Sequence, residues 1–100
     1  MAFAGTPGID ISSWQRDVDF KQVALAGYKF VYVKTSEGLT YKSPTLNVQW
    51  NEAGEAGLAR GGYHFFHPLK DPKRQAEIVV DIVDRLGVGE LPIALDFEGY

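Results

Sequence analysis

Segments with the composition of β-strands alternate strictly with segments that have the spacing of α-helices along this chain. Four runs rich in β-branched and aromatic residues are expected to be strands, at residues 8–12, 28–35, 62–66 and 91–98. Three amphipathic stretches lie between them. This β-α-β-α-β-α-β order predicts a parallel sheet joined by right-handed crossovers. The expected fold class is therefore α/β, a parallel (βα)3β unit.

Each helical stretch has a start signal and a stop signal. Asp19 with a glutamine three residues later resembles a capping box, while Ser43-Pro44 and Asp71-Pro72 each place a cap before a first-turn proline. The three stretches are expected to end at glycines, namely Gly27, Gly57 and Gly87. Residues at helical spacing predict the buried faces: Leu46, Trp50 and Ala53 in the second helix, and Ala76, Val79, Val80, Val83 and Leu86 in the third.

The number of strands limits the architecture. Four strands do not close a (β/α) barrel, which needs eight, so the sequence describes either a small open sheet or half of a barrel. With no internal repeat and no linker, residues 1–100 are interpreted as one domain.

Composition excludes several classes of function. The chain has 100 residues, a net charge of -3 and no block of like charges, which argues against nucleic acid and gives no reason to expect a membrane surface. It has no cysteine, so disulfides and thiolate metal sites are excluded. Residues 1–7 lack the features of a signal peptide, so export is expected to need another route.

Two carboxylates close the last expected strand. Asp96 and Glu98 stand two residues apart, which on a strand puts them on one face, roughly 6 to 7 Å apart at Cβ. Such a pair is suited to acid/base chemistry on a glycosidic bond. It also lies where parallel α/β proteins keep their active sites, at the carboxyl end of a strand.

Asp10 is a third candidate, in the middle of the first expected strand. It lies between Ile9 and Ile11 and therefore faces away from them, toward the cleft if the isoleucines pack under helices. The three acidic residues are then expected to converge from adjacent elements. Carboxylates at close range do not all ionise together, which is the condition for a general acid at neutral pH. The alternative is that these acids pair with Lys34 or cap turns.

The third expected strand and its exit read Tyr-His-Phe-Phe-His over residues 63–67, and they allow two further interpretations. In one interpretation its aromatic rings stack on sugar rings, and in the other they belong to the core. Its histidines, His64 and His67, together with Asp96 and Glu98 suggest a metal site. However, their spacing puts the two histidines on opposite faces of a strand, so no metal and no cofactor is predicted.

With these residues laid out, the chain resembles glycoside hydrolase family 25, the lysozymes of the Chalaropsis type found in bacteria, fungi and phage endolysins. The similarity lies in residues 8–15 (GIDISSWQ), 30–38 (FVYVKTSEG), 56–66 (AGLARGGYHFF), 75–76 (QA) and 91–98 (LPIALDFE). These stretches cover nearly the whole chain in the order and spacing of the family.

The resemblance implies an irregular β/α (TIM-like) barrel that cleaves the β-1,4 bond between N-acetylmuramic acid and N-acetylglucosamine in peptidoglycan. It assigns Glu98 as the general acid. It implies that Asp96 stabilises positive charge at the anomeric centre or orients the acetamido group of the substrate. It also implies that Asp10 is part of the acidic floor of the site. The cleft residues that it implies, with less defined roles, are Lys34, Glu37, Tyr63 and His64.

Family domains are nearly twice as long as this chain, so the resemblance covers the N-terminal half of a catalytic barrel. We expect a truncated chain, a natural fragment that completes itself by pairing, or a rearranged compact fold. A homodimer that completes the barrel is one form of such pairing.

Three functions follow from these observations. The first is a peptidoglycan muramidase whose partner is the glycan strand and whose place of action is the bacterial cell wall, reached by phage holin lysis or another route. The second is a non-catalytic wall-binding or self-assembling half-barrel. The third is a metal-dependent hydrolase that acts on wall acetyl or amide groups.

Overall fold

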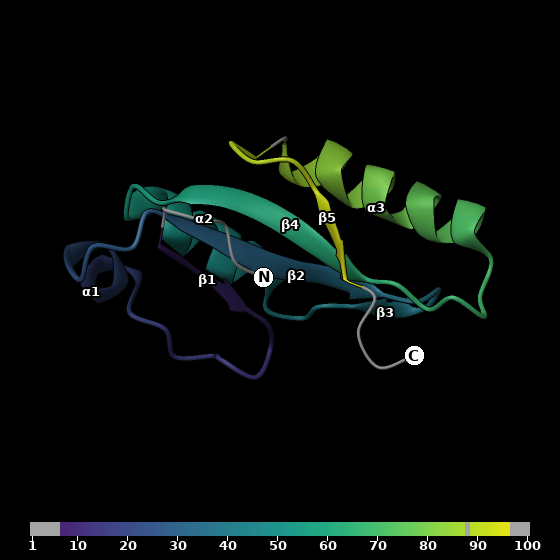
Figure 1. Cartoon of the computed structure of the whole chain (residues 1–100), viewed down its shortest axis with the longest axis horizontal. Helices are drawn as coiled ribbons and strands as arrows, with labels where there is room; N and C mark the ends of the chain where they lie inside the picture. Colours follow the sequence, from purple (N-terminus) through teal and green to yellow (C-terminus); the bar gives the residue numbers. More distant parts are fainter. Residues whose placement is uncertain (1–6, 88, 97–100) are drawn as a thin grey trace.

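The protein folds around one mixed sheet in which the long strands run parallel. The computed structural model describes residues 7–87 and 89–96. Strands β1 (Gly8–Ile11), β2 (Phe30–Glu37), β4 (Ala59–Phe65) and β5 (Ala94–Asp96) follow the order β1-β2-β4-β5, and each neighbouring pair is parallel. The short β3 (Tyr41–Lys42) pairs antiparallel with the end of β2. Figure 1 shows β2 and β4 as the long centre of the sheet.

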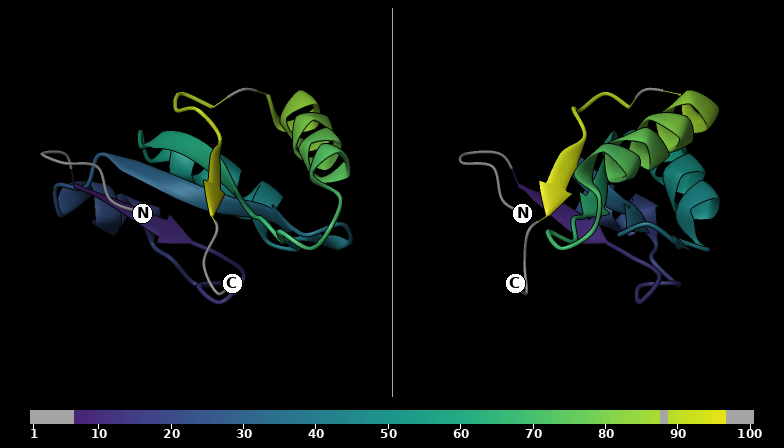
Figure 2. Two further views of the ribbon diagram at one scale, coloured as in Figure 1. Left: turned by 45° about the vertical axis from the view of Figure 1, so that its right-hand side comes forward. Right: turned by 90° about the vertical axis from the view of Figure 1, so that its right-hand side faces the viewer.

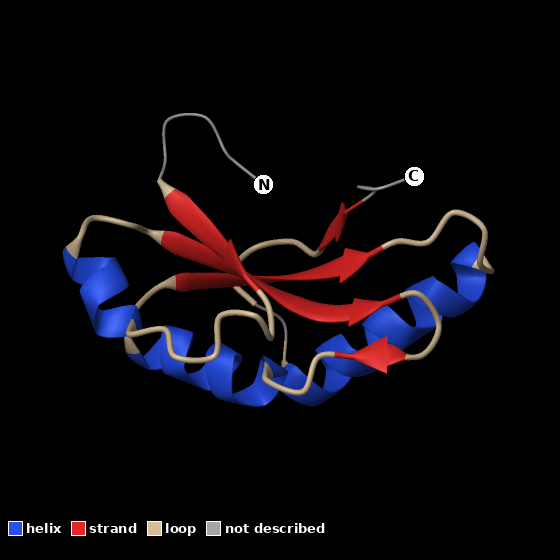
Figure 3. Ribbon diagram, turned by 90° about the horizontal axis from the view of Figure 1, so that it is seen from below, coloured by secondary structure: helices blue, strands red, loops and turns tan. Residues whose placement is uncertain are grey.

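Helices cover one side of this sheet. Helices α1 (Phe20–Leu25), α2 (Leu46–Glu55) and α3 (Pro72–Leu86) follow β1, β3 and β4 in the chain. Figures 2 and 3 show them on the same side of the strands, so among the described residues the other side of the sheet has no helix. The parallel α/β arrangement predicted from the alternation of segments is confirmed.

The two faces of the sheet carry two separate apolar clusters. The cluster under the helices joins alternate residues of the strands, such as Ile11, Val31 and Val33, to Trp50 of α2 and Ile82 of α3. The cluster on the other face contains aromatic residues and the alanines and leucine packed on them: Phe30, Tyr32, Tyr63, Ala59, Leu91 and Ala94. Side-chain alternation along β1 and β2 therefore agrees with the expectation from strand parity.

Close approach to the aromatic cluster explains a glycine in β4. A Cβ atom built on Gly61 would lie 2.5 Å from the ring of Tyr32. The Tyr32 hydroxyl donates a hydrogen bond to the carbonyl oxygen of Pro92 at 3.0 Å, just before β5. The missing side chain at position 61 thus leaves room for the tyrosine that anchors the last described strand.

Two of the three predicted helix starts are confirmed and one is wrong. The carboxylates of Asp19 and Asp71 cap α1 and α3 by accepting backbone hydrogen bonds. In contrast, α2 begins at Leu46 with Thr45 as its N-cap, and no side-chain hydrogen bond caps it. The Ser43 hydroxyl is occupied instead, since it lies 3.4 Å from the hydroxyl of Thr45.

The predicted apolar face of α3 also needs a correction. Val79 is buried as expected, but Ala76 and Val80 face solvent, and Gln75 and Ile82 take their places against the sheet. The face is rotated because a buried polar side chain, Gln75, belongs to it. Such a residue gives no apolar signal in the sequence.

Strand boundaries shift by a few residues from those expected. Strand β2 begins later and runs two residues further than predicted, β4 begins at Ala59, and β3 was not predicted. Near β5, Ile93 is 39% and Leu95 51% exposed. No helix within residues 7–87 and 89–96 has the length and apolar character of a membrane span.

Candidate active site

A β-bulge in β2 determines which side chains reach the helix-free face of the sheet. Lys34 pairs with Tyr63 of β4, but the next pair joins Ser36 to His64, so β2 has one extra residue at this point. Without a bulge, Lys34 and Glu37 would face opposite sides, because they are three residues apart. A bulge redirects the residues that follow it. Both side chains therefore lie on the same side and contact each other.

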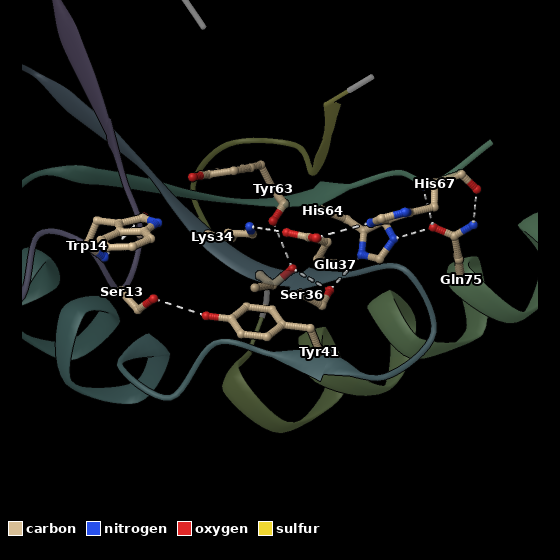
Figure 4. Close-up of polar contacts among 12 residues, drawn as sticks. Ser13, Trp14, Lys34, Ser36, Glu37, Tyr41, Tyr63, His64, His67 and Gln75 are labelled. Carbon is tan, nitrogen blue, oxygen red and sulfur yellow. Dashed lines mark hydrogen bonds and ion pairs between the residues drawn. The ribbon is translucent and has the colours of Figure 1, made fainter. Parts of the chain in front are cut away.

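Lys34 is held in place by a carboxylate and two rings. Its Nζ donates to Glu37 Oε1 at 2.6 Å. The same Nζ lies 5.2 Å from the ring centroid of Tyr41 and 5.3 Å from that of Phe65. Cation-π contacts and a short ion pair fix the ammonium group. Figure 4 shows the ion pair between Lys34 and Glu37.

Glu37 accepts a second hydrogen bond on its other oxygen. His67, just after β4, places Nε2 3.1 Å from Glu37 Oε2. The pKa of Glu37 is lowered, chiefly by the hydrogen bond from Lys34 and also by His67, although partial burial acts in the opposite direction. Glu37 is therefore a carboxylate at neutral pH and an acceptor rather than a source of protons.

His64 lies on the other side of the sheet. Its side chain is 0% exposed and faces α3, so the structure does not bring it together with the other predicted cleft residues. Nδ1 lies 2.8 Å from the Ser36 hydroxyl and Nε2 lies 2.8 Å from Gln75 Oε1. Burial lowers the pKa of His64, which favours the neutral ring.

Gln75 links this buried histidine to the loop that carries His67. Its Nε2 donates to the carbonyl oxygens of His67 and Lys70, at 2.9 and 3.4 Å. Its Oε1 accepts from the backbone N–H of His67 at 3.1 Å and also contacts Nε2 of His64. Because an amide oxygen can only accept, Nε2 of His64 must donate, and the ring proton is therefore on Nε2. A buried amide thus fixes the position from which His67 reaches Glu37.

Tyr63 and Asp96 share the helix-free face with Lys34. Tyr63 is nearly buried in the aromatic cluster. Ala94 packs on the same cluster, and Asp96 follows two residues later on β5, so its side chain points to the same face. Asp96 is level with Phe65 of β4, which in turn pairs with Glu37. The carboxyl ends of β2, β4 and β5 therefore bring these residues to one edge.

The expectation that the three acidic residues come from adjacent elements is wrong for Asp10. Asp10 is on β1, with β2 and β4 between it and β5, which is three strand spacings of about 4.8 Å. Its exposed side chain does face away from Ile9 and Ile11, as expected from parity. Glu98 lies outside the described residues.

Sequence reasoning missed several residues that build this site. His67 was considered only as a metal ligand, and Tyr41 lies in a strand that was not predicted. Gln75 was one of the residues that carry the family resemblance, but no role was assigned to it. The two opposite faces inferred for His64 and His67 are confirmed by their partners, Gln75 and Glu37.

The fold and the site define a class: a parallel α/β protein whose charged and aromatic side chains gather where the strands end. The chain belongs to glycosyl hydrolases family 25, because the model of that family matches residues 9–100. The family resemblance inferred from the motifs is therefore confirmed.

Individual relatives agree with the family. Over 65 residues the chain is 40% identical to lysozyme M1 of Streptomyces globisporus, a match that covers 65% of this chain and 22% of that protein. Over 61 residues it is 48% identical to the N,O-diacetylmuramidase of Arthroderma benhamiae, which covers 61% of this chain and 26% of that protein. The match thus spans about a quarter of these curated relatives.

Solved structures share the fold. The muramidase from Trichobolus zukalii superposes with a TM-score of 0.83 and 34% identity, over 94% of this chain and 47% of the other. The family GH25 lysozyme from Aspergillus fumigatus gives a TM-score of 0.81 and 36% identity, over 93% and 46%. The chain spans less than half of either structure.

Proposed function

We propose that this chain acts in a peptidoglycan hydrolase of the muramidase type, which cleaves the β-1,4 bond between N-acetylmuramic acid and N-acetylglucosamine. The observation that carries the proposal is the position of Asp96 at the carboxyl end of β5, on the helix-free face, in a chain that belongs to glycosyl hydrolases family 25. The partner is then the glycan strand, and the place of action is the bacterial cell wall.

The chemistry assigns different tasks to the two carboxylates. Glu98 is the general acid that protonates the leaving glycosidic oxygen. Asp96 stabilises the positive charge that develops at the anomeric carbon, or orients the acetamido group if that group is the nucleophile. Asp10 contributes negative charge to the floor of the site from β1.

The remaining cleft residues hold the sugar in this proposal. Glu37 is ionised and accepts hydrogen bonds from Lys34 and His67, which suits it to receive a further bond from a sugar hydroxyl or amide. Tyr63 is buried in the aromatic cluster and pairs with Ala94, two residues before Asp96, so it supports the apolar floor of the site. His64 acts from below the sheet as a positioning residue, through Gln75 and the backbone of His67.

The assignment of Glu98 predicts a loss of activity in Glu98→Gln. The amide keeps the shape of the side chain but has no acidic proton, so reducing-end release from purified peptidoglycan is expected to fall roughly 100-fold or more. Circular dichroism is expected to be unchanged. Glu77→Gln, on the exposed face of α3, makes the same change of charge and serves as the matched control.

Retained release in Glu98→Gln would reject the role of that residue. Saturable binding of the chain to insoluble peptidoglycan without any release of reducing ends would instead support the second function, a non-catalytic wall-binding module. Release of acetate or of stem peptide that a chelator abolishes, without release of reducing ends, would favour the third, metal-dependent function.

A further inference from the structure

The turn that follows β1 is fixed by its own hydrogen bonds. The Ser12 N–H donates to Gln15 Oε1 at 2.8 Å, and the Ser12 carbonyl accepts from the Gln15 N–H at 3.1 Å. The Trp14 N–H donates to the Ser12 hydroxyl at 3.3 Å. These bonds close residues 12–15 into a compact turn whose backbone has little freedom.

A buried side chain anchors this turn from below. Gln49 of α2 is almost completely buried, and its Nε2 donates to the carbonyl oxygens of Ser12 and Gln15, at 2.8 and 3.0 Å. Because α2 packs into the core under the sheet, the turn is attached to a buried element. The turn is therefore ordered before any ligand arrives.

This turn presents the indole ring of Trp14 to solvent. Trp14 is 90% exposed, whereas the other tryptophan of the chain, Trp50, is 5% exposed. A single exposed apolar residue is common on protein surfaces, and Leu25 of α1 is an example. Trp14 differs from it in two ways, because its ring is flat and its backbone is fixed.

The indole stands next to the candidate site. The Ser13 hydroxyl lies within hydrogen-bonding distance of the Tyr41 hydroxyl, at 3.0 Å. The Tyr41 ring in turn packs on the ammonium group of Lys34, which binds Glu37. Figure 4 shows these residues as one row from the Trp14 turn to Glu37.

We propose that Trp14 and Tyr41 form a stacking platform for one N-acetylhexosamine ring of the glycan strand, beside the ring that reacts. A pyranose has an apolar C–H face that packs on a flat aromatic ring, while its hydroxyl and acetamido groups need polar partners at the edge. The hydroxyls of Ser13 and Tyr41 supply such partners next to the indole. This inference rests on the proposed function for the identity of the sugar.

The test is a titration with chitotetraose, a soluble β-1,4-linked oligomer of N-acetylglucosamine, followed by NMR. The chain has two tryptophans and so gives two indole N–H signals; loss of one in Trp14→Phe assigns it. Chitotetraose is expected to shift the Trp14 signal and leave that of buried Trp50 in place. Trp14→Ala is expected to weaken binding roughly tenfold, and Trp14→Phe less, because a smaller ring remains.

Leu25→Ala is the matched control, because it removes another exposed apolar side chain, on α1 rather than in the turn, and is expected to bind like the wild type. Binding that persists in Trp14→Ala, a titration that leaves the Trp14 signal unmoved, or no binding by the wild-type chain would each overturn the platform. None of these outcomes bears on the Glu98→Gln assay, so failure of the platform and failure of the proposed catalytic role are distinguishable.

Discussion

At the residue scale, neighbours determine the charge that each candidate side chain carries. Glu37 is ionised because Lys34 and His67 donate to its two oxygens. Burial lowers the pKa of His64 and favours its neutral ring, although the hydrogen bond with Gln75 acts in the opposite direction. The sequence predicted Lys34 and Glu37 as cleft residues through the family resemblance. Their contact was not predictable from spacing, because it depends on the extra residue in β2.

The lowered pKa of Glu37 predicts a stability that depends on pH. A carboxyl whose pKa is lower in the folded state stabilises the fold above its unfolded pKa, and this contribution disappears as the pH falls through the folded value. Glu37→Gln is therefore expected to reduce the free energy of unfolding at about pH 7 by roughly 0.2 to 1 kcal/mol, a range that allows for solvent screening of this partly exposed pair. Urea unfolding measures the difference.

The same measurement at about pH 2, where carboxyls are protonated, is expected to bring wild type and Glu37→Gln close together. Glu77→Gln is expected to show no such convergence, because no ion pair of Glu77 is found within the described part of the chain. An equal gap between wild type and Glu37→Gln at both pH values would contradict the ion-pair explanation.

At the scale of the elements, the sequence predicted a helix start correctly where the capping side chain bonds to backbone N–H groups two or three residues later. Asp19 and Asp71 cap their helices as predicted, since an N-cap needs only the next few residues. The antiparallel β3 pairs with the nearby end of β2, and the shifted start of α2 involves Ser43 and Thr45, so these two misses are local. The rotated face of α3 instead depends on residues of β4 and of the loop after it. Gln75 illustrates this, because its burial is explained by His64 and His67 rather than by its own character.

The caps give a matched pair of substitutions. Asp71→Ala removes a carboxylate that accepts from the N–H groups of Lys73 and Arg74, at 3.0 and 3.4 Å, and is expected to lower the free energy of unfolding by about 1 kcal/mol. Thr45→Ala is expected to lower the free energy of unfolding by no more than about 0.3 kcal/mol, because Thr45 makes no side-chain cap bond. Thermal unfolding compares the two, and an equal loss of stability in both would contradict the assignment of the caps.

At the scale of the whole molecule, the sheet has a covered face, a helix-free face and two edges. Within the described residues, β1 and β5 are the outer strands of the parallel path, and each pairs on one side only. The alternation of segments was enough to predict this parallel sheet, and the sequence motifs were enough to predict its family. The strand order was not predicted, and it is the order that separates Asp10 from Asp96.

Unpaired strand edges favour association between copies, which is how a homodimer that completes the barrel would form. Leu95 lies on β5 and is 51% exposed, so Leu95→Lys puts a charge on this edge where a neighbouring strand would dock. Light scattering is expected to show a mass above that of one chain, rising with concentration, for the wild type and a shift toward the monomer for Leu95→Lys. Leu25→Lys adds the same charge at an exposed site on α1 and is expected to associate like the wild type. A wild-type chain that stays monomeric at all concentrations, or a Leu95→Lys chain that associates unchanged, would exclude pairing through β5.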